Sequence, residues 1–158
     1  MSIVLVRIDD RLIHGQVTVG WGGFLSPDRI LLVSDEIANN EWEKELYENC
    51  VPYNISVSIL TVEEAVLALA KNGFKEERII LLAESPSVIT NLVKQGVSFQ
   101  QVNIGGMHYK NDKKKILPYV YIDDNDKNDF LYLSNNNIEL ICQDLPQSKK
   151  DNLIDFLE

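Results

Sequence analysis

The apolar residues of this chain gather in short runs, and the segments between the runs have helical spacing. Many residues in the runs are β-branched, which favours strands. The runs at 29–34 and 78–83 are continuously apolar rather than alternating, as is typical of parallel strands that helices cover on both faces. The pattern predicts seven strands, at residues 3–9, 29–34, 55–60, 78–83, 99–104, 117–122 and 138–142.

The segments between these strands carry signals for helix ends. Residues 61–64 have the Thr-x-x-Glu spacing of a capping box, and at 85–86 a serine precedes a proline, which suits a first helical position. Gly73 and Gly96 suit helix C-termini. The apolar residues that follow Pro146 predict a terminal amphipathic helix that packs on the sheet.

This regular alternation predicts the α/β fold class, with a doubly wound, mostly parallel sheet of about seven strands and helices on both faces. No linker, repeat or low-complexity stretch interrupts the pattern, so we expect a single domain over residues 1–158. The pattern leaves the strand order open and is compatible with an antiparallel strand near the C-terminal edge. Folds of this class place their sites in the loops at the carboxyl ends of the strands.

Composition and charge narrow the classes of partner. The chain has 158 residues, of which 45% are hydrophobic, enough for the core of one ordinary domain. Its 24 acidic and 15 basic residues give a net charge of −9, the wrong sign for binding nucleic-acid phosphates. No apolar run approaches the roughly 20 residues of a membrane span, and the N-terminal run lacks the flanks of a signal peptide. We therefore expect a cytoplasmic protein that meets a membrane only through a partner and does not bind nucleic acid.

The cysteines and histidines show no metal-binding pattern. Cys50 and Cys142 lie far apart in apolar stretches, so we expect both to be reduced, packed thiols. No ligand spacing for a metal appears elsewhere, and we predict neither a metal nor a bound cofactor.

The loop after the first predicted strand, within residues 7–17, holds two cations, two carboxylates and an imidazole. A neutral imidazole at His14 has a free ring nitrogen that can accept a phosphoryl group, while Asp9 or Asp10 could hold the other nitrogen. The guanidinium of Arg11, three residues before His14, could hold two phosphoryl oxygens. These groups favour an anion-binding site.

Each group in this loop also has a purely structural interpretation. Gly15 and Gln16 are not among these, since they begin the next segment, where backbone N–H groups at a helix start could point at the same phosphate. His14 could be a structural or surface histidine. Arg7 and Arg11 could form ion pairs with the two neighbouring aspartates.

The string Arg-x-Asp-x-Arg-x-x-His-Gly-Gln, which begins at Arg7, closely resembles the active-site loop of IIB components in the mannose, fructose and sorbose family of sugar phosphotransferase systems (PTS). Length and predicted strand number also agree with this family. The likeness covers almost the whole chain and includes residues 17–21, 38–42, 103–107 and 144–146. Asn40 departs from the family pattern, in which an acidic residue is expected, and this affects only the contact made by that second loop.

This resemblance implies a phosphoryl carrier with the activity of a protein-Nπ-phosphohistidine–sugar phosphotransferase. His14 would accept phosphate on Nδ1 from a phosphohistidine of a IIA domain or protein and pass it to a hexose or hexosamine in a membrane IIC/IID permease. Arg11 would bind the phosphate, and Asp9 would contact the loop or the ring. Because His14 must meet a donor histidine and a sugar in turn, we expect its side chain to be largely exposed.

The resemblance leaves the sugar open among mannose, fructose, sorbose, N-acetylgalactosamine and related hexoses. It implies peripheral association with the membrane through the permease. A homo-oligomer is compatible with the sequence.

Other polar residues stand at the ends of further predicted strands. Asn103, Gly105 and Gly106 end one strand, where the glycines could approach a phosphate closely or could form a tight turn. Four residues are candidates for the rim of the site: Asp10, Asp35, Ser85 and Asn103. For Asp35 and Ser85, capping the next helix is the ordinary role.

His108 and a basic cluster follow the glycine pair. We expect His108 to be exposed and solvated, and its role is open. The lysines form a solvated loop, or else a docking surface for an acidic partner; they are Lys110, Lys113, Lys114 and Lys115.

Three other classes of protein compete with the carrier. A receiver domain would need an aspartate at the end of the third strand, and residues 55–61 contain none. A nucleotide-binding module would need a G-x-G-x-x-G or a Walker lysine after a strand, and neither is present. A His-dependent hydrolase or phosphatase with His14 as general base would need a nucleophile, for which only Thr18 is close in sequence. The hydrolase is the alternative to the carrier.

Overall fold

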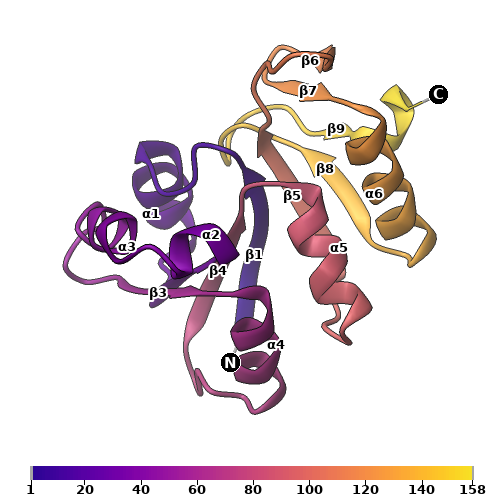
Figure 1. Cartoon of the computed structure of the whole chain (residues 1–158). Helices are drawn as coiled ribbons and strands as arrows, with labels where there is room; N and C mark the ends of the chain where they lie inside the picture. Colours follow the sequence, from indigo (N-terminus) through magenta and orange to yellow (C-terminus); the bar gives the residue numbers. More distant parts are fainter. Residues whose placement is uncertain (1, 158) are drawn as a thin grey trace.

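The computed structural model describes residues 2–157 and contains a seven-stranded sheet with the order β3-β2-β4-β1-β5-β8-β9 (Figure 1). All pairs in this sheet are parallel except β8 with β9. The predicted α/β class and mostly parallel sheet are therefore confirmed. The strands are β1 (Ser2–Asp9), β2 (Arg29–Val33), β3 (Ser56–Leu60), β4 (Arg78–Ala83), β5 (Gln101–Gly106), β8 (Glu139–Cys142) and β9 (Asp151–Asn152).

The central strands are buried on both sides because their apolar residues alternate between two cores. In β2, Leu31 and Val33 belong to one core, whereas Ile30 and Leu32 belong to the other. The first core lies under α4 (Val62–Ala70), α5 (Pro86–Lys94) and α6 (Asp124–Asn135). The continuously apolar runs in the sequence reflect this double burial.

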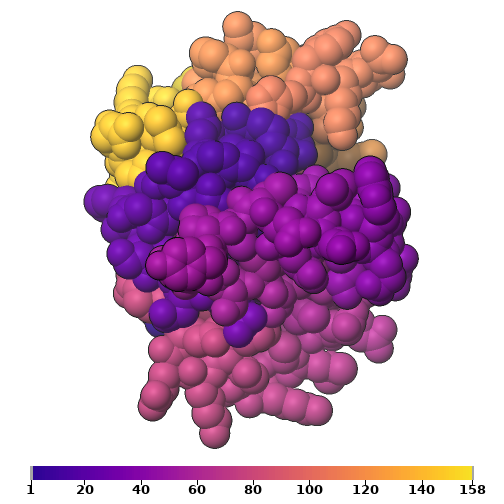
Figure 2. Space-filling model, turned by 90° about the vertical axis from the view of Figure 1, so that its left-hand side faces the viewer, coloured from indigo at the N-terminus to yellow at the C-terminus, as the bar shows by residue number. Residues whose placement is uncertain are grey.

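The second core lies under the segments that follow β1 and β2. These are the π-helix η1 (Gln16–Trp21), α1 (Gly22–Leu25), α2 (Asp35–Ala38) and α3 (Glu41–Glu48). Figure 2 shows these segments side by side, in indigo and purple, covering that face of the molecule. Helices therefore lie on both faces of the sheet, as predicted.

The predicted helix starts at 61–64 and 85–86 are confirmed. The Thr61 hydroxyl accepts from the backbone N–H of Glu64 at 3.1 Å, and the Glu64 carboxylate accepts from the backbone N–H of Thr61 at 3.2 Å. Pro86 is the first residue of α5. Gly96, just beyond α5, has a φ of +100°, which glycine adopts at little cost.

Two predicted elements are wrong. Residues 117–122 form no single strand: β6 (Lys114–Leu117) and β7 (Val120–Ile122) make an antiparallel hairpin outside the main sheet. Pro118 falls at the reversal, where its missing N–H removes no ladder bond. The segment after Pro146 contains β9 and a short 3₁₀-helix, η2 (Leu153–Phe156), instead of an amphipathic α-helix.

The side chain of Gln143 accounts for part of this second difference. Its Nε2 donates to the carbonyl oxygens of Pro146 and Ser148 at 3.0 and 3.2 Å, so the backbone curls around it. The chain then returns antiparallel to β8, and Leu153 reaches the core.

The two cysteines differ in burial. Cys142 is buried in β8, as predicted, whereas Cys50 is exposed just beyond α3, and the prediction for Cys50 is wrong. Helix α3 has no fully buried residue, so the end of this helix stays at the surface.

The carboxyl ends of β1 and β5 define the place where a site is expected. The chain leaves β1 towards η1 over the second core, whereas after β5 it reaches α6 over the first core. In such sheets, adjacent strands whose connections leave on opposite faces open a crevice at their carboxyl ends. Within residues 2–157, no helix is long and apolar enough to cross a membrane.

Candidate active site

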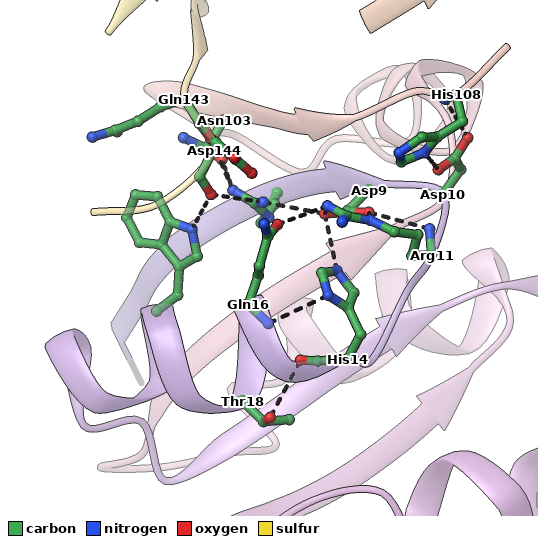
Figure 3. Close-up of polar contacts among 12 residues, drawn as sticks. Asp9, Asp10, Arg11, His14, Gln16, Thr18, Asn103, His108, Gln143 and Asp144 are labelled. Atoms are coloured by element: carbon green, nitrogen blue, oxygen red, sulfur yellow. Dashed lines mark hydrogen bonds and ion pairs between the residues drawn. The ribbon is translucent and has the colours of Figure 1, made fainter. Parts of the chain in front are cut away.

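Asp9, the last residue of β1, is the centre of the cluster in Figure 3, and its side chain is fully buried. Its Oδ2 lies 3.1 Å from Nη2 of Arg7, 2.9 Å from Nη2 of Arg11 and 3.1 Å from Nε2 of His14. Its Oδ1 accepts from the backbone N–H and from Nε of Arg11 at 3.1 and 3.0 Å. One carboxylate therefore joins the three basic side chains of the loop.

These contacts keep Asp9 ionised. Burial on its own would raise the pKa of Asp9, but the hydrogen bonds from His14 and Arg11 and the charge of Arg7 outweigh it. The pKa of Asp9 is therefore held well below its ordinary value.

Both ring nitrogens of His14 have a hydrogen-bond partner, a buried carboxylate at Nε2 and a backbone N–H at Nδ1. Because an ionised carboxylate can only accept, the contact with Asp9 assigns the proton of the neutral ring to Nε2 and leaves the lone pair on Nδ1. The backbone N–H of Gln16 points at this Nδ1 across 3.3 Å. The side chain is 20% exposed, so the expectation of a largely exposed His14 is wrong. The contact with buried Asp9 holds the ring against the sheet edge and leaves only part of it open.

The backbone between Arg11 and His14 fixes this arrangement. Leu12 has a φ of +62° and is buried, and its N–H donates to the carbonyl of Asp9 at 3.0 Å. The carbonyl of His14 accepts from the N–H groups of Val17 and Thr18, both at 3.0 Å, where η1 begins. The ring therefore stands on the first turn of a helix, as the glycine-glutamine pair had suggested.

Arg11 and Gln16 form the open side of the site. The side chain of Arg11 is 35% exposed, and its Nη2 donates to Oε1 of Gln16 at 2.7 Å. The hydrogen bond to Asp9 raises the pKa of Arg11 above its ordinary value, which is already high, so the side chain of Arg11 is always charged. Apart from its two neighbours in the chain, no atom of residues 2–157 lies within 4 Å of a methyl group added at Gly15. There is thus open space next to Gly15, the residue that follows His14.

The two glycines at the end of β5 make room for side chains of the site. A Cβ at Gly106 would lie 3.0 Å from Oδ1 of Asp9 and 3.2 Å from Nη2 of Arg11. A Cβ at Gly105 would overlap the guanidinium of Arg7. Asn103 lies beneath the site rather than on its rim, because it is buried and its Oδ1 accepts from Nη1 of Arg7 at 2.6 Å.

The remaining rim candidates lie in different places. Asp10 holds His108 twice, through the ring Nδ1 and the backbone N–H, both at 2.7 Å. Ser85 and Asp10 line a neighbouring polar cavity of about 340 Å³. Asp35 instead accepts from the backbone N–H of Val62 at 2.8 Å, at the start of α4. Asp35 thus has a structural contact away from the cluster.

The lysines of the basic cluster differ in their exposure and contacts. Lys113 forms an ion pair with Asp126 at 2.7 Å and is largely buried, whereas Lys114 and Lys115 are exposed on β6. His108 is about half exposed, as predicted.

Arg7 is the site residue whose position the sequence prediction did not give. Its Nη1 donates to the carbonyl of Gln143 at 3.1 Å, and its Nη2 donates to the carbonyl of Asp144 at 3.0 Å. The centroid of the Trp21 ring lies 5.5 Å from Cζ of Arg7, and Nε1 of Trp21 donates to the same carbonyl of Asp144 at 3.0 Å. A signal was present, since Arg7 interrupts an apolar strand two residues before Asp9 and so shares its face.

The fold and the site together define a doubly wound α/β protein with a carboxylate-held histidine and two arginines at its carboxyl edge. Comparison with known families gives a match over residues 3–158 to the family described as PTS system sorbose subfamily IIB component. The chain belongs to this family and is a IIB component of a sugar phosphotransferase system, whose IIB components act as phosphotransferases.

Relatives with known names match nearly the whole of this chain. The PTS system fructose-specific EIIB component of Bacillus subtilis is 35% identical over 99% of this chain and 96% of its own. The mannose-specific EIIAB component of Escherichia coli is 32% identical over 99% of this chain, which spans 49% of that longer protein. The crystal structure of the IIBSor domain of the sorbose permease from Klebsiella pneumoniae superposes with a TM-score of 0.93 at 31% identity, over 99% of this chain and 96% of that one.

Proposed function

We propose that His14 is the phosphoryl carrier of this IIB component and that Nδ1 is the atom that bears the phosphate. The contact between Asp9 and Nε2 of His14 is the observation that carries this proposal, because it leaves the lone pair of the ring on Nδ1. In the transfer, the bond between the donor histidine nitrogen and phosphorus breaks as the bond from Nδ1 to phosphorus forms. The donor ring, protonated on its other nitrogen, leaves as a neutral imidazole, and the ring of His14, which keeps its proton on Nε2, takes up the positive charge beside ionised Asp9.

The groups around Nδ1 suit a bound phosphoryl group. The backbone N–H of Gln16 already points at this nitrogen, at the start of a helix, where N–H groups attract anions. Arg11 is partly exposed, and a turn of its side chain would bring a permanent positive charge to the phosphoryl oxygens. Gly15 leaves the approach open. Phosphoryl transfer needs mainly positioning and charge stabilisation, and these groups supply both.

The donor in this proposal is a phosphohistidine of a IIA domain or protein, and the acceptor is a hexose or hexosamine bound by a IIC/IID permease. The E. coli relative named as an EIIAB component supports a IIA partner, because IIA and IIB stand together in its name. The names of relatives cite fructose, sorbose, mannose and N-acetylgalactosamine. We propose a sugar of this class, residues 1–158 as one functional domain, and a place at the membrane surface through the permease.

The test is intact mass spectrometry after incubation with phosphoenolpyruvate, the general PTS proteins and a cognate IIA. The wild type and His14→Ala are compared with His108→Ala, which removes the other histidine of the chain. The wild type and His108→Ala should each gain roughly 80 Da as a single acid-labile phosphoryl group. His14→Ala should remain unmodified.

Two other outcomes would contradict the proposal. Modification of His14→Ala would place the phosphate on another residue. An adduct on the wild type that water removes within seconds, with no sugar acceptor present, would favour the hydrolase over the carrier.

A further inference from the structure

The side chain of Arg7 is buried and makes hydrogen bonds to groups from two strands of the sheet and from the loop after a third. Its side chain is fully buried, and it reaches β5 through Asn103, the end of β8 through the carbonyls of Gln143 and Asp144, and β1 through Asp9. Its Nε has no hydrogen-bond partner among the residues that the structure describes. The guanidinium is thus directed at Asp9 and the carbonyls, and one of its own donors is left unsatisfied.

The sheet itself is shaped to hold this side chain. Arg7 and Asn103 are direct partners in the pairing of β1 with β5, and the register then slips so that Asp9 pairs with Gly106. The extra residue on β5 is Gly105, and the guanidinium of Arg7 occupies the space where a Cβ would stand. Any other residue there would displace the arginine.

The two arginines of the loop differ in their freedom. Arg11 is 35% exposed and is bound to Asp9 and Gln16, both of which it can leave without crossing the core. Arg7 is enclosed and cannot follow a ligand. When the side chain of Arg11 turns to a phosphoryl group, Asp9 loses the two hydrogen bonds from that guanidinium and keeps Arg7 as its buried cation.

We propose that Arg7 is a positioning residue that holds Asp9 ionised against Nε2 of His14 throughout the transfer, so that Arg11 is free to bind the phosphoryl group. This inference rests on the proposed function of His14. Without the charge of Arg7, a buried carboxyl group tends to protonate and can then donate to Nε2, which moves the ring proton to Nδ1 and blocks the nucleophile. Arg7 would therefore act on the choice of ring nitrogen without touching the phosphate.

The experiment compares Arg7→Gln, which removes the charge, with Arg7→Lys, which keeps it. Arg29→Gln is the matched control, because Arg29 also pairs with a carboxylate but stands at the other end of the sheet strands. Long-range ¹⁵N–¹H NMR of unphosphorylated protein reports which nitrogen of His14 carries the proton. Phosphorus NMR reports which nitrogen carries phosphate, and steady-state kinetics with phosphorylated IIA gives kcat and KM.

For Arg7→Gln we expect a mixture of ring tautomers, some phosphate on Nε2, and a fall in kcat on the order of 10²-fold with KM changed less than about twofold. Arg7→Lys should keep the wild-type tautomer with a smaller fall in kcat. Arg29→Gln should match the wild type in all three measurements. A folded Arg7→Gln with the wild-type tautomer and kcat would overturn the proposal.

A second variant covers the case in which Arg7→Gln does not fold. Asn103→Ala removes the shortest hydrogen bond of Arg7 and leaves its charge in place. It should lower kcat about tenfold, with the NMR signals of the His14 ring shifted towards those of a tautomer mixture. Wild-type values in both measurements would overturn the proposal. Since the tautomer is read on unphosphorylated protein, this result is separate from whether His14 accepts phosphate at all.

Discussion

Two arginine–carboxylate pairs stand at opposite ends of the sheet strands, and they differ in a way that burial alone does not predict. At the amino ends, Arg29 binds Glu77 with two hydrogen bonds, at 2.6 and 2.9 Å, with both side chains partly exposed. At the carboxyl ends, Arg7 and Asp9 are fully buried and share a single contact of 3.1 Å. The better geometry thus belongs to the less buried pair.

The difference lies in how many groups each carboxylate serves. In the outer pair, both oxygens of Glu77 face Arg29, and the hydrogen bond to Glu77 raises the pKa of Arg29. In the inner pair, burial lowers the pKa of Arg7, and Asp9 divides its oxygens among Arg7, Arg11 and His14. A bidentate ion pair stabilises the folded protein by itself, whereas a carboxylate shared among several side chains fixes their positions relative to one another.

The largest expected effect comes from neutralising each carboxylate in turn. Asp9→Asn should leave Arg7 buried without a counter-charge and cost about 3–5 kcal/mol of unfolding free energy. It should also lower the rate of phosphoryl transfer by roughly 10²–10⁴-fold, because the ring of His14 loses a charged group that can only accept, and an amide NH₂ can donate to Nε2 in its place. Glu77→Gln should cost about 1 kcal/mol or less and leave transfer unchanged. Urea unfolding measures the free energy of unfolding, and single-turnover transfer from IIA measures the transfer rate. Equal losses in Asp9→Asn and Glu77→Gln would contradict the distinction between the two carboxylates.

A smaller effect is expected from adding one methyl group near the inner pair. Gly105→Ala should push the guanidinium of Arg7 aside and cost about 1–3 kcal/mol through overpacking. Gly23→Ala is the control, since a Cβ there meets no described atom within 4 Å outside its chain neighbours and the backbone of its own helix, and it should change stability by less than about 1 kcal/mol. Transfer should slow in Gly105→Ala alone. A normal rate in that variant would show that Arg7 can move without consequence.

The most gradual effect is the loss of stability in acid. The pKa of Asp9 in the folded protein is below its ordinary value of 3.8, so its stabilisation is complete above that pH and falls as the pH drops further. Below the ordinary value, one such group contributes a slope of up to about 1.4 kcal/mol per pH unit. The difference in unfolding free energy between wild type and Asp9→Asn should therefore shrink between pH 4 and pH 2. A constant difference over this interval would mean that Asp9 does not titrate with folding.

The strands and the local part of the site could be predicted from sequence because their signals are local. A strand covered on both faces has few polar positions, so runs such as 29–33 and 78–83 are found nearly to the residue. Asp9, Arg11 and His14 lie within six positions of one another, and a turn after a strand brings such residues together. The presence of a charged cluster followed from the sequence, whereas the bonding among its members did not.

The missed contacts are all between residues distant in the chain. Arg7 is joined to Asn103, Gln143 and Asp144 across strand pairings whose order the periodicity did not give. Two of these partners act through backbone carbonyls, which every residue type carries, so composition contains no sign of them. The predicted strand at 117–122 runs through Pro118, whereas Pro118 lies at the reversal between the two strands of the hairpin at 114–122.

The left-handed backbone conformation of Leu12 affects the entropy cost of each transfer cycle. Leu12 is neither glycine nor asparagine, yet it has a φ of +62°, and its side chain is buried in the core. Burial in the core, made once at folding, offsets the unfavourable backbone conformation and holds the loop in one shape. Ordering a flexible loop at each encounter would cost about 1–2 kcal/mol per residue. A carrier that is loaded and unloaded repeatedly avoids that entropy loss in every cycle, because its loop is already set before any partner arrives.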